Sequence, residues 1–101
     1  MGRKRNGREP RPEPSRYEIQ VTRAAERGLA SLPKADTSRV DAAILGLAVD
    51  RHPLGSKKLQ GEIDLYRIRV GDYRVIYEVD ARRHVVLVVN IGNRRDIYRS
   101  I

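Results

Sequence analysis

Hydrophobic and polar positions alternate on either side of Gly71-Asp72, from Tyr66 to Val70 and from Tyr73 to Val75, so the segment from Lys57 to Tyr77 is predicted to form a two-stranded hairpin. Gly71-Asp72 lies in the middle of this segment and suits the positive φ values of a tight two-residue turn. That turn fixes the register, so Arg69 lies opposite Arg74 and Arg67 shares their face. The other face is then apolar or aromatic throughout, with Tyr66, Ile68, Val70, Tyr73, Val75 and Tyr77.

The gathering of arginines on one face of the hairpin is unfavourable for folding alone. Like charges placed directly across a ladder, as in the pair Arg69 and Arg74, destabilise it by roughly 0.2–1 kcal/mol. The pattern therefore indicates a second requirement, namely an anionic partner on this face. A cationic surface that is merely solvated is the alternative interpretation.

The first predicted elements before this hairpin are a strand and a helix. Tyr17–Val21 alternates and predicts a strand whose inward side chains are Tyr17, Ile19 and Val21. Thr22 is a suitable N-cap for a short helix that extends to about Leu32 and is ended by Pro33.

A second helix follows, with Asp36 or Thr37 as its predicted cap and His52-Pro53 as its end. Its apolar positions have the helical spacing i, i+3, i+4, i+7 and are Val40, Ala43, Ile44, Leu47 and Ala48. We expect the two helices to pair as an antiparallel hairpin over the sheet.

After the arginine hairpin, Ala81–Arg83 turns the chain into a last strand over His84–Ile91. Val85–Val89 is apolar on both faces, as expected of a strand with neighbours on both sides, and Gly92-Asn93 is expected to break it. The predicted fold is α+β with the order β-α-α-β-β-β, in which an antiparallel-rich twisted sheet packs against an N-terminal helical hairpin.

Composition divides the chain into two parts. Residues 1–16 are rich in proline and arginine and nearly devoid of apolar side chains, so we expect a disordered basic tail followed by one domain over 17–101. The 101 residues carry a net charge of +8. The surplus of positive charge lies in the tail and in the half of the domain that holds the arginine hairpin, which predicts a localised basic surface.

Several classes of chemistry lack support in the sequence. There is no cysteine, and the two histidines, His52 and His84, have no ligand-like spacing, so we expect neither a metal site nor a cofactor. No serine lies in a nucleophile motif, and no glycine-rich phosphate loop is present. No apolar run approaches the ~20 residues of a membrane helix, and no secretory signal is evident. We therefore expect a cytoplasmic protein without a membrane partner.

The remaining candidates for chemistry are guanidiniums and one phenol. Pairing the second hairpin strand with the last strand would bring Arg94, Arg95 and Tyr98 beside the arginine face. Guanidiniums bind phosphate bidentately and suit the stabilisation of a pentavalent phosphoryl transition state. Structural explanations remain open for some residues. Arg95 could form an ion pair with Asp96 or Glu78, and Arg82 and Arg83 could be ordinary turn residues. The hairpin tyrosines could belong to the core; they are Tyr66, Tyr73 and Tyr77.

The segments KKLQG, LYRIRVGDYRVIYEVD and VVNIGNRRDIY together resemble the RelE/ParE superfamily of bacterial toxins from type II toxin–antitoxin pairs. The resemblance covers about 17–101 and implies the compact sheet and helical hairpin of that family. Members of the RelE branch cut messenger RNA in the ribosomal A site without a metal, by attack of a 2′-hydroxyl on the adjacent phosphate.

The resemblance also assigns roles to residues. It implies the catalytic set Arg67, Arg69, Arg74, Arg94 and Tyr98, and RNA contacts by Lys57, Lys58 and Arg95. Arg74 and Arg94 would hold the phosphate, and Tyr98 would orient the nucleotide or handle a proton. The chain departs from the best-known members at Arg67 and Arg69, where those have lysines, and Tyr98 follows Arg94 at a shorter spacing than in some members.

The implied function is a ribosome-dependent mRNA endoribonuclease whose partners are the ribosome, mRNA and an acidic cognate antitoxin, with which it would form a hetero-oligomer. Two alternatives remain open. A ParE-type toxin would share the fold and inhibit DNA gyrase by binding alone, and an inactive member would survive as a binding partner. The joint presence of the five candidate catalytic residues favours cleavage.

Overall fold

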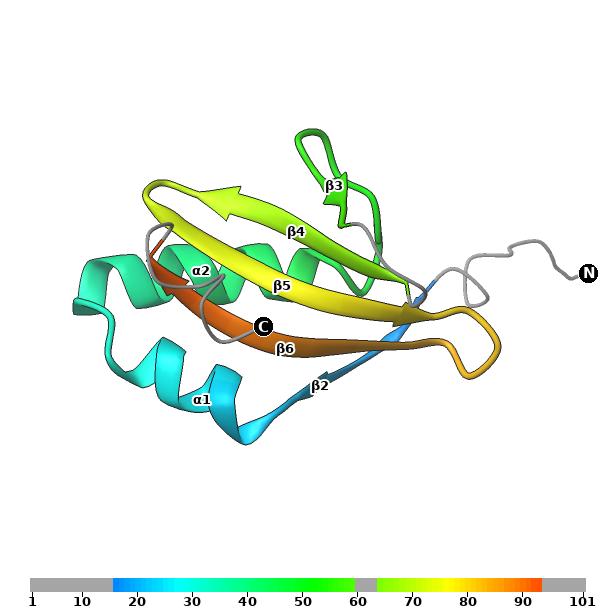
Figure 1. The fold of residues 1–101 in the computed structure, drawn as a ribbon, viewed down its shortest axis with the longest axis horizontal. Coiled ribbons are helices and arrows are strands. Elements are labelled where there is room, and N and C mark those ends of the chain that lie inside the picture. Colours follow the sequence, from blue (N-terminus) through cyan, green and yellow to red (C-terminus); the bar gives the residue numbers. More distant parts are fainter. Residues whose placement is uncertain (1–15, 60–63, 94–101) are drawn as a thin grey trace, which may run out of the picture.

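The structure, a computed structural model, describes residues 16–59 and 64–93. Its elements are β2 (Glu18–Val21), α1 (Arg23–Ala30), α2 (Lys34–Gly46), β3 (Lys57–Lys58), β4 (Leu65–Val70), β5 (Tyr73–Asp80) and β6 (Val85–Asn93) (Figure 1). The strands form one sheet in the order β2-β6-β5-β4-β3, in which only the β2–β6 pair is parallel. The α+β class and the predicted order are confirmed, with the two-residue strand β3 as an addition.

The arginine hairpin has the predicted register. Arg69 pairs with Arg74 and Val70 with Tyr73 across the turn, where Gly71 adopts a φ of +62°. Glycine tolerates this left-handed conformation without the steric strain of a Cβ atom. The turn chemistry therefore determines which side chains share each face of β4 and β5.

The first helix begins where the sequence indicates. Thr22 is the N-cap of α1, and its Oγ1 accepts a hydrogen bond from the amide of Ala25 at 3.1 Å. The same hydroxyl donates to the carbonyl of Val89 in β6 at 2.7 Å. Val89 is the extra residue of a β-bulge, because Ile76 pairs with Asn90 and the next residue of β5 pairs with Val88. The bulge presents a carbonyl to Thr22, so the cap of α1 is also tied to the sheet.

The predicted limits of the second helix are wrong. The helix begins at Lys34 after the N-cap Pro33, so Asp36 and Thr37 lie in its first turn. The Thr37 hydroxyl instead donates back to the carbonyl of Pro33 at 3.2 Å. The helix ends at Gly46, before His52-Pro53, and a series of turns follows. Proline fixes a φ suited to a helix start, so α2 begins after Pro33 and not after a side-chain cap at Asp36 or Thr37.

The predicted break at Gly92-Asn93 is also wrong. β6 continues through both residues, with Gly92 opposite Arg74 and Asn93 opposite Tyr73. The backbone ladder with β5 does not depend on a side chain at Gly92, so the missing Cβ does not end the strand. β6 therefore runs beside the whole of β5, the second strand of the hairpin that carries the arginines.

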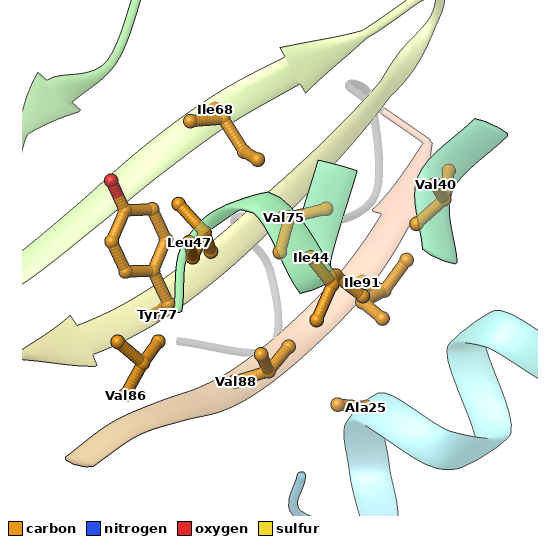
Figure 2. Packing of buried hydrophobic residues seen from close by; sticks show 10 residues of the cluster. All are labelled: Ala25, Val40, Ile44, Leu47, Ile68, Val75, Tyr77, Val86, Val88 and Ile91. Carbon is orange, nitrogen blue, oxygen red and sulfur yellow. The ribbon is translucent and has the colours of Figure 1, made fainter. Parts of the chain in front are cut away.

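The hydrophobic core lies between the sheet and the two helices (Figure 2). Its buried members are Ala25, Val40, Ile44, Leu47, Ile68, Val75, Tyr77, Val86, Val88 and Ile91. Tyr17 and Ile19 pack against this cluster as predicted, but Val21 is 37% exposed, at the end of edge strand β2. Within the described residues, no helix has the length and apolar character needed to cross a membrane.

Tyr77 makes the stability of the domain dependent on pH at alkaline values. Its ring is fully buried and its hydroxyl donates to the carbonyl of Arg51 at 2.7 Å. Burial raises the pKa of Tyr77 from 10.0 to about 12. Because the folded state holds this proton more tightly than the unfolded chain, the contribution is complete below pH 10 and is lost as the pH rises through about 12.

We therefore expect Tyr77→Phe to lower the free energy of unfolding at neutral pH by about 1 kcal/mol, the value of one hydrogen bond. The difference between the parent protein and the variant should shrink between pH 10 and 12. Denaturant titrations across this range measure both effects. Parallel stability profiles for the two proteins would contradict the assignment.

Candidate functional site

The arginines of the hairpin lie on the face of the sheet turned away from the two helices. Arg74 alternates with Tyr73 and Val75, which pack on the core side, and it pairs with Arg69 on β4. Arg67 follows two residues away, opposite Ile76. In Figure 1, α2 lies behind the sheet, and β4 and β5 cross in front of it. We call the surface formed by Arg67, Arg69 and Arg74 the arginine face.

Arg74 is the most unusual residue of this face because it is only 8% exposed. This side chain is thus buried although it does not belong to the hydrophobic core cluster. Its guanidinium donates to the carbonyl of Tyr73 at 3.4 Å, and no ion pair joins it to a carboxylate within residues 16–59 and 64–93. A buried charge without a counter-ion is unfavourable, so this position suits an anionic ligand.

The two neighbouring arginines extend the same positive charge toward solvent. Arg69 is exposed, and Arg67 is half-buried beside Ile76, which is itself fully buried. The aliphatic stem of Arg67 is well placed to cover Ile76 while its guanidinium remains in water. Neither arginine is ion-paired in the described part of the chain. The arginine face therefore combines one buried cation with two that are accessible.

The two lysines predicted to contact RNA separate at the edge of the sheet. Lys57 pairs with Arg67, so the alternation of side chains places it on the arginine face. Lys58 pairs with Tyr66 and belongs to the other face, where its ammonium lies 3.1 Å from a carboxylate oxygen of Asp64. The hydrogen bond to Asp64 raises the pKa of Lys58 above its usual value. Of the two, only Lys57 is brought next to the arginines.

A contact between α2 and the hairpin turn was not predicted from the sequence. The hydroxyl of Tyr73 donates to Asp36 at 3.0 Å, and this hydrogen bond raises the pKa of Tyr73. Arg39 lies 3.6 Å from Asp36 and places its guanidinium over Gly71. The early start of α2 at Pro33 brings both residues to the turn. Arg39 thus adds a cation at the rim of the arginine face, and Tyr73 anchors the strand that carries Arg74.

The positive charge of the arginine face does not extend along the whole length of β5. Farther along β5 the same face carries Glu78 and Asp80, and Glu18 lies opposite Val85 on the other side of β6. These carboxylates would repel a polyanion that ran along the strands. The described residues contain no group of three or more histidine, cysteine, aspartate or glutamate side chains arranged to hold a metal ion.

Three predicted residues, Arg94, Arg95 and Tyr98, lie outside the described residues. The described part of β6 ends at Asn93, directly opposite Tyr73. In the sequence, Arg94 is the residue that directly follows Asn93. The arginine face in its described part can bind a phosphate group and stabilise added negative charge on it.

Comparisons with known proteins show the family of this chain. The family of ParE toxins of the type II toxin–antitoxin system parDE matches residues 19–98. Toxin RelE of Mycobacterium tuberculosis is 34% identical over 85 residues, which cover 82% of this chain and 87% of the relative. Toxin RelG of the same organism is 33% identical over 88 residues, which cover 82% and 97%.

Solved structures show the same fold. The archaeal RelE–RelB complex of Pyrococcus horikoshii contains a chain that is 31% identical, with a TM-score of 0.67 over 77% of this chain and 94% of that one. The intact RelBE toxin–antitoxin complex of Escherichia coli gives the same TM-score of 0.67 at 22% identity, over 76% of this chain and 95% of that one. The chain therefore belongs to the RelE/ParE superfamily of type II toxin–antitoxin systems, as a toxin of the RelE family.

Proposed function

We propose that this toxin is a ribosome-dependent endoribonuclease that cuts messenger RNA at the arginine face. The observation that carries the proposal is Arg74, 8% exposed and without a carboxylate partner in the described residues, directly opposite the second guanidinium of Arg69. Protein folding alone does not favour such a pair. The phosphodiester of an mRNA would neutralise one of the two charges and accept hydrogen bonds from both side chains, and the negative charge that develops in the transition state would match the other.

The proposed reaction needs an in-line attack rather than a protein nucleophile. The 2′-oxygen of one ribose attacks the adjacent phosphorus, a cyclic 2′,3′-phosphate forms, and the bond to the 5′-oxygen of the next nucleotide breaks. The proton of the 2′-hydroxyl leaves as the new bond forms, and the departing 5′-oxygen takes up a proton. Negative charge grows on the phosphoryl oxygens, where Arg74 and Arg69 would stabilise it, assisted by Arg94.

Accessory contacts follow from the geometry of the face. Arg67 and Lys57 lie side by side on β4 and β3 and are placed to hold a neighbouring phosphate. Tyr98, Arg95 and Lys58 remain proposed contacts of the nucleotide or the RNA. The ribosome would supply the extended mRNA and hold the reacting atoms in line.

We also propose an acidic antitoxin as the cellular partner of this cytoplasmic protein. Two of the similar solved structures are toxin–antitoxin complexes, one from an archaeon and one from E. coli. A carboxylate-rich segment would neutralise the arginine face and block access of phosphate. Leu45, Val49 and Leu54 are 60%, 57% and 105% exposed and offer apolar contacts elsewhere on the toxin, so a hetero-oligomer is expected.

A reconstituted translation reaction tests the proposed activity. The purified toxin should truncate mRNA on programmed ribosomes and leave the same naked RNA intact, and an acidic cognate antitoxin should suppress the effect. A parallel assay of DNA gyrase supercoiling should be unaffected. Inhibition of gyrase with intact mRNA would establish the ParE-type activity instead, and no effect in either assay would mark an inactive member.

A further inference from the structure

We propose that the turn between β5 and β6 is a second RNA-binding surface, which holds the phosphate backbone of folded RNA away from the arginine face. The surface consists of Arg82, Arg83 and His84, and we call it the basic turn. Arg82 and Arg83 are exposed and have no carboxylate partner within residues 16–59 and 64–93. The proposal goes beyond cleavage and concerns where else the toxin contacts RNA.

The basic turn is held in one shape by its own hydrogen bonds. Oδ1 of Asp80 accepts from the amides of Arg82 and Arg83 at 3.1 and 3.0 Å. His84 has a φ of 56°, a left-handed conformation that residues other than glycine rarely adopt. Its carbonyl accepts from the amide of Glu18 at 2.9 Å, which ties the strained residue to β2. Such strain at an exposed turn persists only where the surroundings fix it and points to a use of the turn.

An aromatic stack supports the turn from beneath. The ring of Tyr17 lies 4.9 Å from that of His84, and the guanidinium carbon of Arg51 lies 3.9 Å from the Tyr17 centroid. Tyr17 is therefore engaged by cationic or polar groups and offers no free platform for a nucleobase. Recognition at this end must depend on phosphate contacts, which carry no sequence information.

The basic turn and the arginine face are distinct sites. Asp80 lies six positions after Arg74 on β5, a distance of about 20 Å along a strand. The carboxylates of Glu78, Asp80 and Glu18 lie between the two surfaces. One phosphate cannot contact both, so an RNA held at both ends of the sheet must present phosphates that are well separated.

The surroundings of the basic turn favour a large polyanion. An open cavity of about 440 Å³ adjoins it and is lined by Asp80, Arg82 and Arg83. Arg82 and Arg83 are adjacent in the chain, so two exposed positive charges lie together at this opening. Positive charge of this extent suits the dense phosphates of an RNA helix better than a single small anion.

The test measures binding of a blunt RNA duplex, which has no single-stranded segment to cut, to the full-length protein at a series of salt concentrations. Arg82→Gln with Arg83→Gln should weaken binding and reduce the slope of log affinity against log salt by about two, one for each lost phosphate contact. The control is Arg23→Gln with Arg27→Gln, which removes the same charge from exposed positions on α1 and should leave the slope unchanged.

An unchanged slope in the turn variant, or an equal reduction in the α1 control, would overturn the proposal. Binding of an acidic polypeptide that depends on Arg82 and Arg83, with duplex binding unaffected, would also overturn it and indicate a protein partner. The result is independent of cleavage: Arg74→Gln should abolish mRNA cutting and retain the dependence of duplex binding on the basic turn. A toxin that cuts no RNA could still show that dependence.

Discussion

Arg74→Lys should lower the rate of mRNA cleavage on the ribosome by about two to three orders of magnitude, as removal of one preorganised donor from a transition state does. Lysine keeps the positive charge but loses the planar fork that binds two phosphoryl oxygens at once. The side chain is buried opposite Arg69, so water cannot easily replace the missing donor. Single-turnover cleavage of ribosome-bound mRNA measures the effect.

The burial of Arg74 makes a stability control necessary. Arg23→Lys changes an exposed arginine on α1 in the same way and should leave both cleavage and melting temperature unchanged. Arg74→Lys should retain most of the parent stability, because among residues 16–59 and 64–93 the guanidinium makes a single long hydrogen bond, 3.4 Å, to the Tyr73 carbonyl. Full cleavage by a folded Arg74→Lys protein would remove Arg74 from the proposed reaction.

Gly28→Ala should reduce the free energy of unfolding by about 1–3 kcal/mol, the usual effect of overpacking. A Cβ atom at Gly28 would overlap the carbonyl oxygen of Ile91 in β6, and the Ile91 side chain is also near. Backbone at a buried strand cannot yield as a flexible side chain does, so α1 would have to move away from the sheet. The loss exceeds the gain of up to about 1 kcal/mol that alanine brings to a helix.

Gly46→Ala is the matched control, because Gly46 lies in the last turn of α2 as Gly28 does in α1, but a Cβ atom there would meet nothing within 4 Å. This change should raise the free energy of unfolding by about 0.4–1 kcal/mol, through the reduced freedom of the unfolded chain. Denaturant titrations of both variants give the comparison. Equal stabilisation by the two alanines would contradict the close approach of α1 to β6.

The parts of the fold that were predicted correctly are those determined by local chemistry. Gly71-Asp72 permits one tight turn, and that turn fixes every pair from Val70 with Tyr73 outward. Thr22 likewise supplies a hydroxyl in the right place for a helix cap. The placement of Arg67, Arg69 and Arg74 on one face follows from these short-range rules and the alternation of a strand.

The parts that were missed depend on contacts between distant segments. Gly92 was expected to end β6, but the ladder with β5 continues across it because Arg74 supplies a backbone partner. The burial of Arg74 and the hydrogen bond from Tyr73 to Asp36 both arise from packing that no local pattern encodes. For the hydrogen bond from Tyr73 to Asp36, one local feature was informative. Pro33 favours a helix that starts before Asp36.

The central claim is that the arginine face promotes attack of a ribose 2′-hydroxyl on the adjacent phosphate of ribosome-bound mRNA. The most direct measurement first maps the cut by primer extension, then repeats the reaction with an mRNA that carries a single 2′-deoxynucleotide on the 5′ side of the cut. We predict that this substitution abolishes cleavage at that position, and that the normal mRNA yields a fragment ending in a 2′,3′-cyclic phosphate. Cleavage of the deoxy-substituted mRNA at the same bond would contradict the proposed chemistry, and an uncut normal mRNA would contradict the proposed function.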